Sequence, residues 1–428
     1  MYQHMNTINY IMKEGCQWFN IIKPLSDYLI GRRVKMQLIE FISNYEVLKI
    51  LQELISIEGH KEVAEKESRV ADYILKLLQK EGIEAELDQI EENRPNVYGY
   101  IRGEEEGIEL MFNGHTDTIP GFTMDYDAFN PFIRDGKIFG RGSADMKAGL
   151  TAALAAMIAI KRSGVKLRKT VMFAGVIDEE ERSKGTERLI EKGIIPKMVV
   201  IGEPTQLEVS IAHKGMEWME VKFKGRSTHG SRPHEGINAI YMASEFNRLV
   251  LEVLQPEIES RQFDLVGYGS INVGVINGGN DPNIVPDTCT IQIDRRWLPN
   301  ETLESIYREV QDLAQKVVDK FGGSFETREM RELTASMINA PHSIDIKHPL
   351  VTETIKLVEK HTNNKRTPRD FPAWSDAGLL SNHSEAECII IGPGNINQAH
   401  ANDEFCEIEQ IIQGTNIYFD LIEKFCVN

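Results

Sequence analysis

The stretch VMFAGVIDEEE, residues 171–181, places seven apolar or small residues directly before four acidic ones. A short apolar run of this kind is typical of a strand that is buried on both faces of a sheet. Four acids in a row usually form a solvated loop, but here they follow the carboxyl end of the predicted strand. Open α/β sheets place their functional sites at that edge. The stretch therefore predicts an α/β fold with an acidic site at one edge of its sheet.

Similar short apolar runs lie on both sides of this stretch, and together they predict the strands Val97–Ile101, Leu110–Asn113, Val171–Ile177 and Val199–Ile201. Between two of these strands, Ala148–Arg162 is rich in alanine and leucine, which favours a helix. A further helix is predicted at about Val63–Glu81. Alternation of strands and helices indicates a central, mostly parallel sheet in an α/β domain.

The pattern changes after about residue 213. Apolar Met219, Val221 and Phe223 alternate with charged residues, which indicates a half-exposed strand. The following segments predict the order βαββαβ, which is ferredoxin-like, before the α/β pattern resumes. We therefore expect an inserted module at residues 213–330, a catalytic domain formed by residues 36–212 and 331–428, and an N-terminal appendage of unknown role at residues 1–35.

Composition excludes several classes of partner. The chain has 428 residues and a net charge of −17, which argues against binding to nucleic acid or to an anionic membrane surface. No apolar run reaches the roughly 18 residues of a membrane helix. The five cysteines are never spaced as CxxC, which favours reduced thiols in the cytoplasm over a disulfide framework or a cysteine zinc site.

Histidine and acidic residues follow strand after strand. His115 and Asp117 end one predicted strand, where residues i and i+2 face the same way. His115 could then bind a metal through one ring nitrogen while Asp117 accepts the proton of the other. Further candidates follow other strands or a turn: Asp145 in GRGSADMK (140–147), Glu179 and Glu180, Glu203 in GEPT (202–205), Gly392 in GPG (392–394) and His400 in AHA (399–401).

These donors suit a pair of divalent cations. Oxygen and imidazole ligands without thiolate favour Zn²⁺, Co²⁺ or Mn²⁺. Five ligands, one of them bridging, are enough for two ions about 3.5–4 Å apart, which could polarise a carbonyl and acidify a shared water. A neighbouring carboxylate would then move the proton. The glycines of residues 140–147 fit neither nucleotide-binding motif, and neither GxSxG nor HExxH occurs.

From about Met36 to Asn428, these motifs resemble, in order, the co-catalytic metallopeptidase and deacylase family of acetylornithine deacetylase, succinyl-diaminopimelate desuccinylase, aminoacylase and bacterial glutamate carboxypeptidase. The resemblance implies a zinc-peptidase-like domain in which one metal is held by His115, Asp145 and Glu203 and the other by Asp145, Glu180 and His400. It also implies that Glu179 is the general base and that Asp117 orients the metal-binding histidine.

The inserted module resembles the lid and dimerisation domain of that family. Its segment STHGSRPH (227–234) maps His229 onto a histidine that reaches the site of a neighbouring subunit in a homodimer. Asn283 and Arg296 match the motif that binds the substrate carboxylate, although Arg295 stands beside Arg296. Gly392 is a further substrate-binding candidate. In contrast to the family, which often has small residues after the second glutamate, this chain continues with Glu181-Arg182-Ser183-Lys184.

The resemblance implies a hydrolase of an amide bond next to a free carboxylate, acting on an N-acyl amino acid. A dipeptidase or carboxypeptidase shares the metal ligands and is the alternative, so only the substrate pocket would distinguish the two. A metal-free binding protein with the same fold would be expected to lack at least one ligand or the general base. This chain has all of them.

Overall fold

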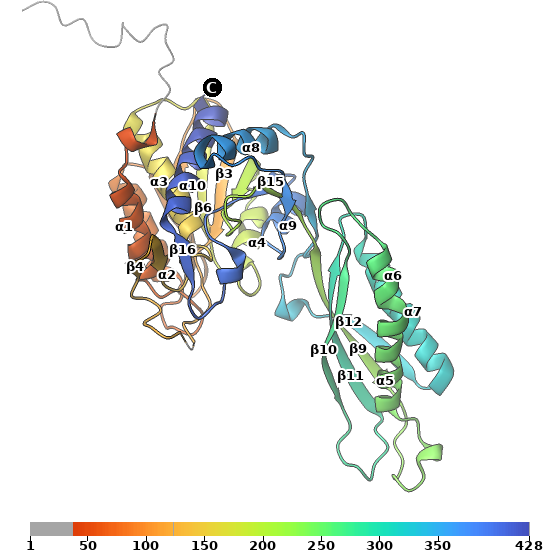
Figure 1. The fold of residues 1–428 in the computed structure, drawn as a ribbon. Helices are drawn as coiled ribbons and strands as arrows, with labels where there is room; N and C mark the ends of the chain where they lie inside the picture. Colours follow the sequence, from red (N-terminus) through yellow and green to blue (C-terminus); the bar gives the residue numbers. More distant parts are fainter. Residues whose placement is uncertain (1–36, 123, 428) are drawn as a thin grey trace, which may run out of the picture.

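The computed structural model describes residues 37–122 and 124–427, so the expected appendage at residues 1–35 lies outside the described residues. The described chain forms an α/β body from which a second, elongated unit extends (Figure 1). Within this described part, no helix combines the length and the apolar character that a bilayer crossing requires.

A mixed sheet forms the centre of the α/β body. Its strands run in the order β1 (Glu84–Glu91), β2 (Arg94–Ile101), β6 (Thr170–Val176), β3 (Ile108–His115), β7 (Pro196–Ile201), β15 (Glu387–Ile390), β8 (Ser210–His213) and β13 (His342–Ser343), with β14 (Arg369–Asp370) paired to β8. The parallel arrangement predicted from the sequence holds from β6 to β15. Antiparallel pairs flank this middle, so the sheet as a whole is mixed.

Helices cover both faces of this sheet. Leu110 and Phe112 of β3 pack into the larger core, together with α1 (Asn44–Ile55), α2 (Ser68–Lys80), α3 (Lys147–Ser163), α8 (Pro349–Thr362) and α10 (Ile408–Ile422). Met111, between them, points to the opposite face and packs with α4 (Lys184–Glu191) and α9 (Ala377–His383). Because both faces are buried, the middle strands carry mainly apolar runs, which is why the sequence predicts them well.

The second unit, which we call the lid, has its own sheet and core. Its elements are β9 (Gly215–Lys224), α5 (Ala239–Leu249), β10 (Ser270–Gly278), β11 (Thr288–Trp297), α7 (Leu303–Phe321) and β12 (Ser324–Glu329), in the predicted order βαββαβ. The sheet order is β10-β11-β9-β12. Met219, Val221 and Phe223 of β9 are buried with residues of α5 and α7, while the intervening residues of β9 lie on the other face. Among the described residues, no helix covers that other face of the lid sheet.

Two parts of the body differ from the sequence prediction. The helix expected at Val63–Glu81 begins only at Ser68, because the residues before it form turns and Lys66 has a φ of 45°. A three-stranded sheet of β4 (Phe132–Arg134), β5 (Lys137–Phe139) and β16 (Phe405–Glu407) was not predicted. This small sheet joins a segment in the first third of the sequence to one near residue 405.

Candidate metal centre and active site

The predicted ligands come together at the carboxyl edge of the parallel strands. His115 ends β3, Glu179 follows β6 and Glu203 follows β7, and these three strands are neighbours. Asp145 is supplied by the turn before α3, and His400 by the loop after the short helix Ile396–Gln398. Polar side chains from segments far apart in sequence therefore lie together at this edge of the sheet, as the alternation of strands and helices predicts.

Asp145 lies between two imidazoles. Its Oδ1 is 3.0 Å from Nε2 of His115, and its Oδ2 is 3.6 Å from Nε2 of His400. Each oxygen of this one carboxylate thus faces a different histidine. This is the arrangement that a ligand shared between two metal ions requires, because each oxygen can bind one ion.

Two carboxylates complete the surroundings of these histidines. Oε1 of Glu203 lies 3.8 Å from Nε2 of His115, and Oε2 of Glu180 lies 2.9 Å from Nε2 of His400. Potential ligand atoms of His115, Asp145 and Glu180 lie within 4.8 Å of one another, and so do those of His115, Glu179 and Glu203. The donors are oxygen and imidazole nitrogen, which fits zinc, cobalt or manganese.

The charges of this cluster also fit bound cations. Burial, together with the negative charge of Glu203, raises the pKa of Glu179 well above its ordinary value. Burial and the charge of Asp145 do the same to the pKa of Glu203. Burial alone would lower the pKa of His115, but its hydrogen bond to Asp145 and the surrounding carboxylates raise it. Divalent cations would relieve this repulsion between carboxylates.

Asp117 faces His115 with both its main chain and its side chain. Nδ1 of His115 lies 2.9 Å from the main-chain oxygen of Asp117, whereas its distance to the Asp117 carboxylate is 3.7 Å. The main-chain oxygen of Asp117 is therefore the nearer acceptor for Nδ1 of His115, and the carboxylate lies within ion-pair distance of the same ring nitrogen. The carboxylate also accepts hydrogen bonds from the main-chain N–H groups of Glu179 (3.4 Å) and Glu180 (3.2 Å). Burial raises the pKa of Asp117 to about 7.

A buried ion triad that the sequence did not reveal supports the acidic turn. Nε of Arg94 donates to Glu67 (2.9 Å), and Nη1 of Arg94 lies 2.7 Å from Oδ1 of Asp178, the residue before Glu179. The side chains of Glu67 and Asp178 are 0% and 1% exposed. An isolated arginine inside a strand gives no signal of such a role.

Asp376 is another buried acid close to the cluster, directly before α9. Its Oδ2 accepts a hydrogen bond of 2.6 Å from Oγ1 of Thr186, in α4. Burial raises the pKa of Asp376 to about 6, while the hydrogen bonds from Thr186 and Ser183 oppose that shift. It therefore adds to the negative charge around the candidate metal centre.

Arg296 and Arg295 lie on opposite faces of β11. The Arg295 side chain is fully buried on the helix-covered face and pairs with Glu301 at 2.8 Å. Arg296 lies on the face without helices, where its Nε and Nη2 donate to the carboxylate of Asp294 at 2.8 and 3.0 Å. Asp294 was not singled out from the sequence, although its i, i+2 spacing to Arg296 places the two on one face. Of the two arginines, Arg296 is the accessible one.

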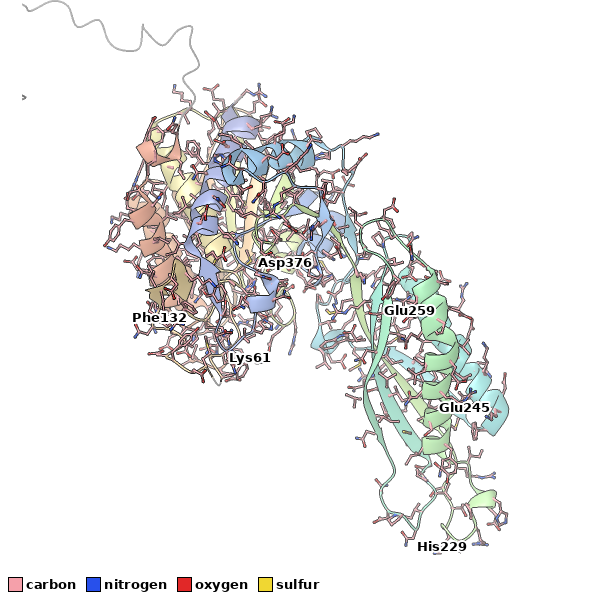
Figure 2. The ribbon with its side chains drawn as sticks, viewed as in Figure 1. Lys61, Phe132, His229, Glu245, Glu259 and Asp376 are labelled. Carbon is pink, nitrogen blue, oxygen red and sulfur yellow. The ribbon has the colours of Figure 1, made fainter. Side chains whose placement is uncertain are left out.

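The remaining candidates, His229, Asn283 and Gly392, lie in two separate places. His229 and Asn283 are on adjacent loops at the tip of the lid, where the N–H of Gly230 donates to the main-chain oxygen of Asn283 at 2.6 Å. Figure 2 shows His229 at the end of the lid that is remote from Asp376 and from Lys61, which pairs with Glu181 of the acidic turn. Gly392 lies in the α/β body, and a Cβ there would be 2.3 Å from the carbonyl oxygen of Gly202. Glycine at this position thus permits close packing beside Glu203.

Comparison with known proteins agrees with this site. The chain is 26% identical over 413 residues to a probable succinyl-diaminopimelate desuccinylase of Staphylococcus epidermidis, covering 90% of this chain and 98% of that protein. It is 28% identical over 357 residues to an acetylornithine deacetylase of Aliivibrio salmonicida, covering 81% and 88%.

A solved structure shows the same fold. The aminopeptidase PepT of Bacillus cereus matches with a TM-score of 0.75 and 20% identity, over 90% of this chain and 99% of that one. The model of Peptidase family M20/M25/M40 matches residues 111–424, which include every candidate metal ligand. With its shared carboxylate between two imidazoles, the chain is a hydrolase that belongs to peptidase family M20/M25/M40.

Proposed function

We propose that this protein removes the acyl group of an N-acyl amino acid by hydrolysing an amide bond next to a free carboxylate. The names of the desuccinylase and deacetylase relatives support this substrate class. The observation that carries the chemistry is the Asp145 carboxylate, which faces His115 with one oxygen and His400 with the other.

In this proposal, two divalent ions, zinc or alternatively cobalt or manganese, share Asp145. His115 and Glu203 complete one set of ligands, and Glu180 and His400 complete the other. The bound ions would polarise the scissile carbonyl and lower the pKa of a water between them.

Glu179 is the proposed general base. It is partly buried, and it neighbours His115 and Glu203 without being needed in either ligand set. Its carboxylate would take the proton of the attacking water and deliver it to the leaving amine. Asp117 holds the main chain of Glu179 and Glu180 in place for this transfer.

Arg296 is the proposed partner of the substrate carboxylate. A planar guanidinium binds a carboxylate through two charge-assisted hydrogen bonds. Asp294 already holds Nε and Nη2 of Arg296, which fixes the orientation of the guanidinium. We further propose that Asn283 and Gly392 contribute to the substrate site.

The cysteines support a proposed location. Cys289, Cys388, Cys406 and Cys426, in the described residues, are free and buried. We propose that they reflect a cytoplasmic, reducing setting.

We also propose that two chains pair through the lid and that His229 completes the site of the partner subunit. The position of His229 at the lid tip supports this arrangement, because its own chain's ligands lie in the α/β body. An imidazole donor there would stabilise the oxyanion that forms on the substrate, which is typically worth about 10²–10³ in kcat.

Subunit exchange tests this part of the proposal. Glu179→Gln and His229→Ala chains, each inactive alone, are mixed under conditions in which subunits are shown to exchange. If His229 acts in the partner's site, heterodimers regain one intact site and activity returns. A mixture that exchanges but stays inactive would leave His229 outside the partner's site, while the proposed metal chemistry would still stand.

A hydrolysis screen tests the substrate class. Protein loaded with zinc or cobalt is offered N-acetyl, N-succinyl and N-formyl amino acids, alongside dipeptides and tripeptides. We expect turnover of at least one acyl amino acid to exceed that of the peptides. The alternative is a dipeptidase or carboxypeptidase, and preferential cleavage of peptides would decide for it.

A further inference from the structure

Glu404 is a buried carboxylate that holds the loop of the bridging ligand. It is 0% exposed. One oxygen accepts hydrogen bonds from Nη1 of Arg141 (2.7 Å) and the N–H of Gly142 (3.0 Å). The other accepts from the N–H groups of Ala144 (2.8 Å) and Asp145 (3.1 Å). Four donors on one carboxylate fix the loop from both sides, because charge-assisted bonds of this kind are the strong ones.

The small sheet explains why Glu404 reaches this loop. β5 (Lys137–Phe139) pairs with β16 (Phe405–Glu407), so the residues beside these strands are neighbours. The N–H of Gly140 donates to the main-chain oxygen of Glu404 at 3.2 Å, continuing that pairing. Glu404 itself follows His400 by four residues. The strand pair therefore brings the loop of Asp145 and the loop of His400 together.

A second contact joins the same two loops. Nη1 of Arg141, which binds Glu404, also donates to the main-chain oxygen of Ala401 at 3.2 Å. Ala401 is the residue directly after His400. Arg141 is 1% exposed, so water cannot easily replace either bond.

We infer that Glu404 is a positioning residue that sets the distance between Asp145 and His400 and thereby the affinity of the second metal site. This inference rests on the proposed two-metal function. The second site draws Asp145 and His400 from the two joined loops, whereas the first draws only Asp145 from them. Loss of the carboxylate should therefore weaken the second site more than the first.

The decisive variant is Glu404→Gln, which keeps the size of the side chain. Glutamine can accept from the N–H groups on one side, but its NH₂ group would face the donors on the other. Chelator-treated protein is titrated with Zn²⁺ by calorimetry, which gives one affinity for each site. We expect one of the two affinities to fall about 10- to 100-fold, the usual effect of losing a partner that orients a ligand, while the other changes by less than about threefold. The affinity that His400→Ala abolishes identifies the second site, and this is the one that Glu404→Gln should weaken.

Glu217→Gln is the matched control. Glu217 is also buried (2% exposed), accepts a hydrogen bond from Tyr307 at 2.8 Å and lies 3.5 Å from Arg331, but it belongs to the lid. Both zinc affinities of this variant should equal those of the wild type. The control thus separates loss of a buried carboxylate in general from loss of the one that joins the ligand loops.

The outcomes are distinct. Unchanged zinc affinities in folded Glu404→Gln, or equal weakening of both sites, would overturn the positioning role. If Glu404→Gln does not fold, Glu404→Asp decides in its place, because it keeps the charge but withdraws the carboxylate by one methylene from all four donors; unchanged affinities there would again overturn the inference. Fewer than two zinc ions in the wild type would instead contradict the proposed function.

Discussion

Replacing Glu179 with glutamine should separate catalysis from metal binding. The amide keeps the shape of the side chain but cannot accept the proton of the attacking water. General base catalysis is typically worth about 10²–10⁴-fold, which corresponds to about 2.7–5.4 kcal/mol in the activation barrier. Each proposed ligand set is complete without Glu179, so both metals should remain bound.

Glu180→Gln is the matched contrast, because it changes the neighbouring residue in the same chemical way. Oε2 of Glu180 lies 2.9 Å from Nε2 of His400, in the second ligand set. Its loss should lower metal content toward one equivalent, with activity partly restored by excess metal. Metal is measured by elemental analysis after dialysis, and kcat by steady-state kinetics on the best substrate of the screen.

The pH profile provides an independent check on Glu179. A general base must be deprotonated, so kcat/KM of the wild type should fall as the pH drops below the pKa of that base. Glutamine does not titrate in this range, so the residual activity of Glu179→Gln should lack this acidic limb. If Glu179→Gln loses metal and Glu180→Gln keeps metal but loses turnover, the assignments of base and ligand are exchanged.

The other predictions concern metal content, stability and substrate choice. His400→Ala should lower bound metal from about two equivalents toward one; a fully active enzyme after complete chelation would exclude a metal mechanism. Arg94→Met should cost about 3–5 kcal/mol of unfolding free energy, because Glu67 and Asp178 stay buried without their cation. Burial already raises the pKa of Asp178, and Arg94 opposes that shift. The loss of unfolding free energy, measured by urea melts, should therefore be full at high pH and fade at lower pH, where protonation removes the charge of Asp178. A loss that does not depend on pH would contradict this account. Amidation of the substrate carboxylate should lower kcat/KM from several-fold to orders of magnitude in the wild type but little in Arg296→Ala, and equal wild-type rates on acid and amide would remove Arg296 from the site.

The sequence predicts the middle of the fold better than its edges. Strands β3 and β6 are buried on both faces, so their apolar runs are continuous and easily recognised. Strand β1 (Glu84–Glu91) is partly exposed along its whole length and carries no such run. Strands β13 and β14 have two residues each, which is too short for any periodicity. These strands are recognised only from their pairing with β2 or β8 in the folded structure.

The same distinction applies to the site. His115, Glu179 and Glu203 can be found from the sequence because each follows a predicted strand, and parallel strands end at a common edge. Arg94 and Glu404 could not be found in this way. Their partners lie elsewhere in the chain, as in the contact between Glu404 and Arg141, 263 positions apart. Contacts between residues this far apart follow no spacing rule, so only the tertiary structure identifies them.

The lid tip limits how His229 can reach a metal centre. The hydrogen bond from Gly230 to Asn283 ties the two tip loops, so these candidates move as one unit. To serve its own chain, the whole lid would have to rotate about its connections to the body, one of which is short, since β8 ends at His213 and β9 begins at Gly215. A site completed by a partner requires only that two chains pair. Because His229→Ala loses activity under either arrangement, subunit exchange is the measurement that distinguishes them.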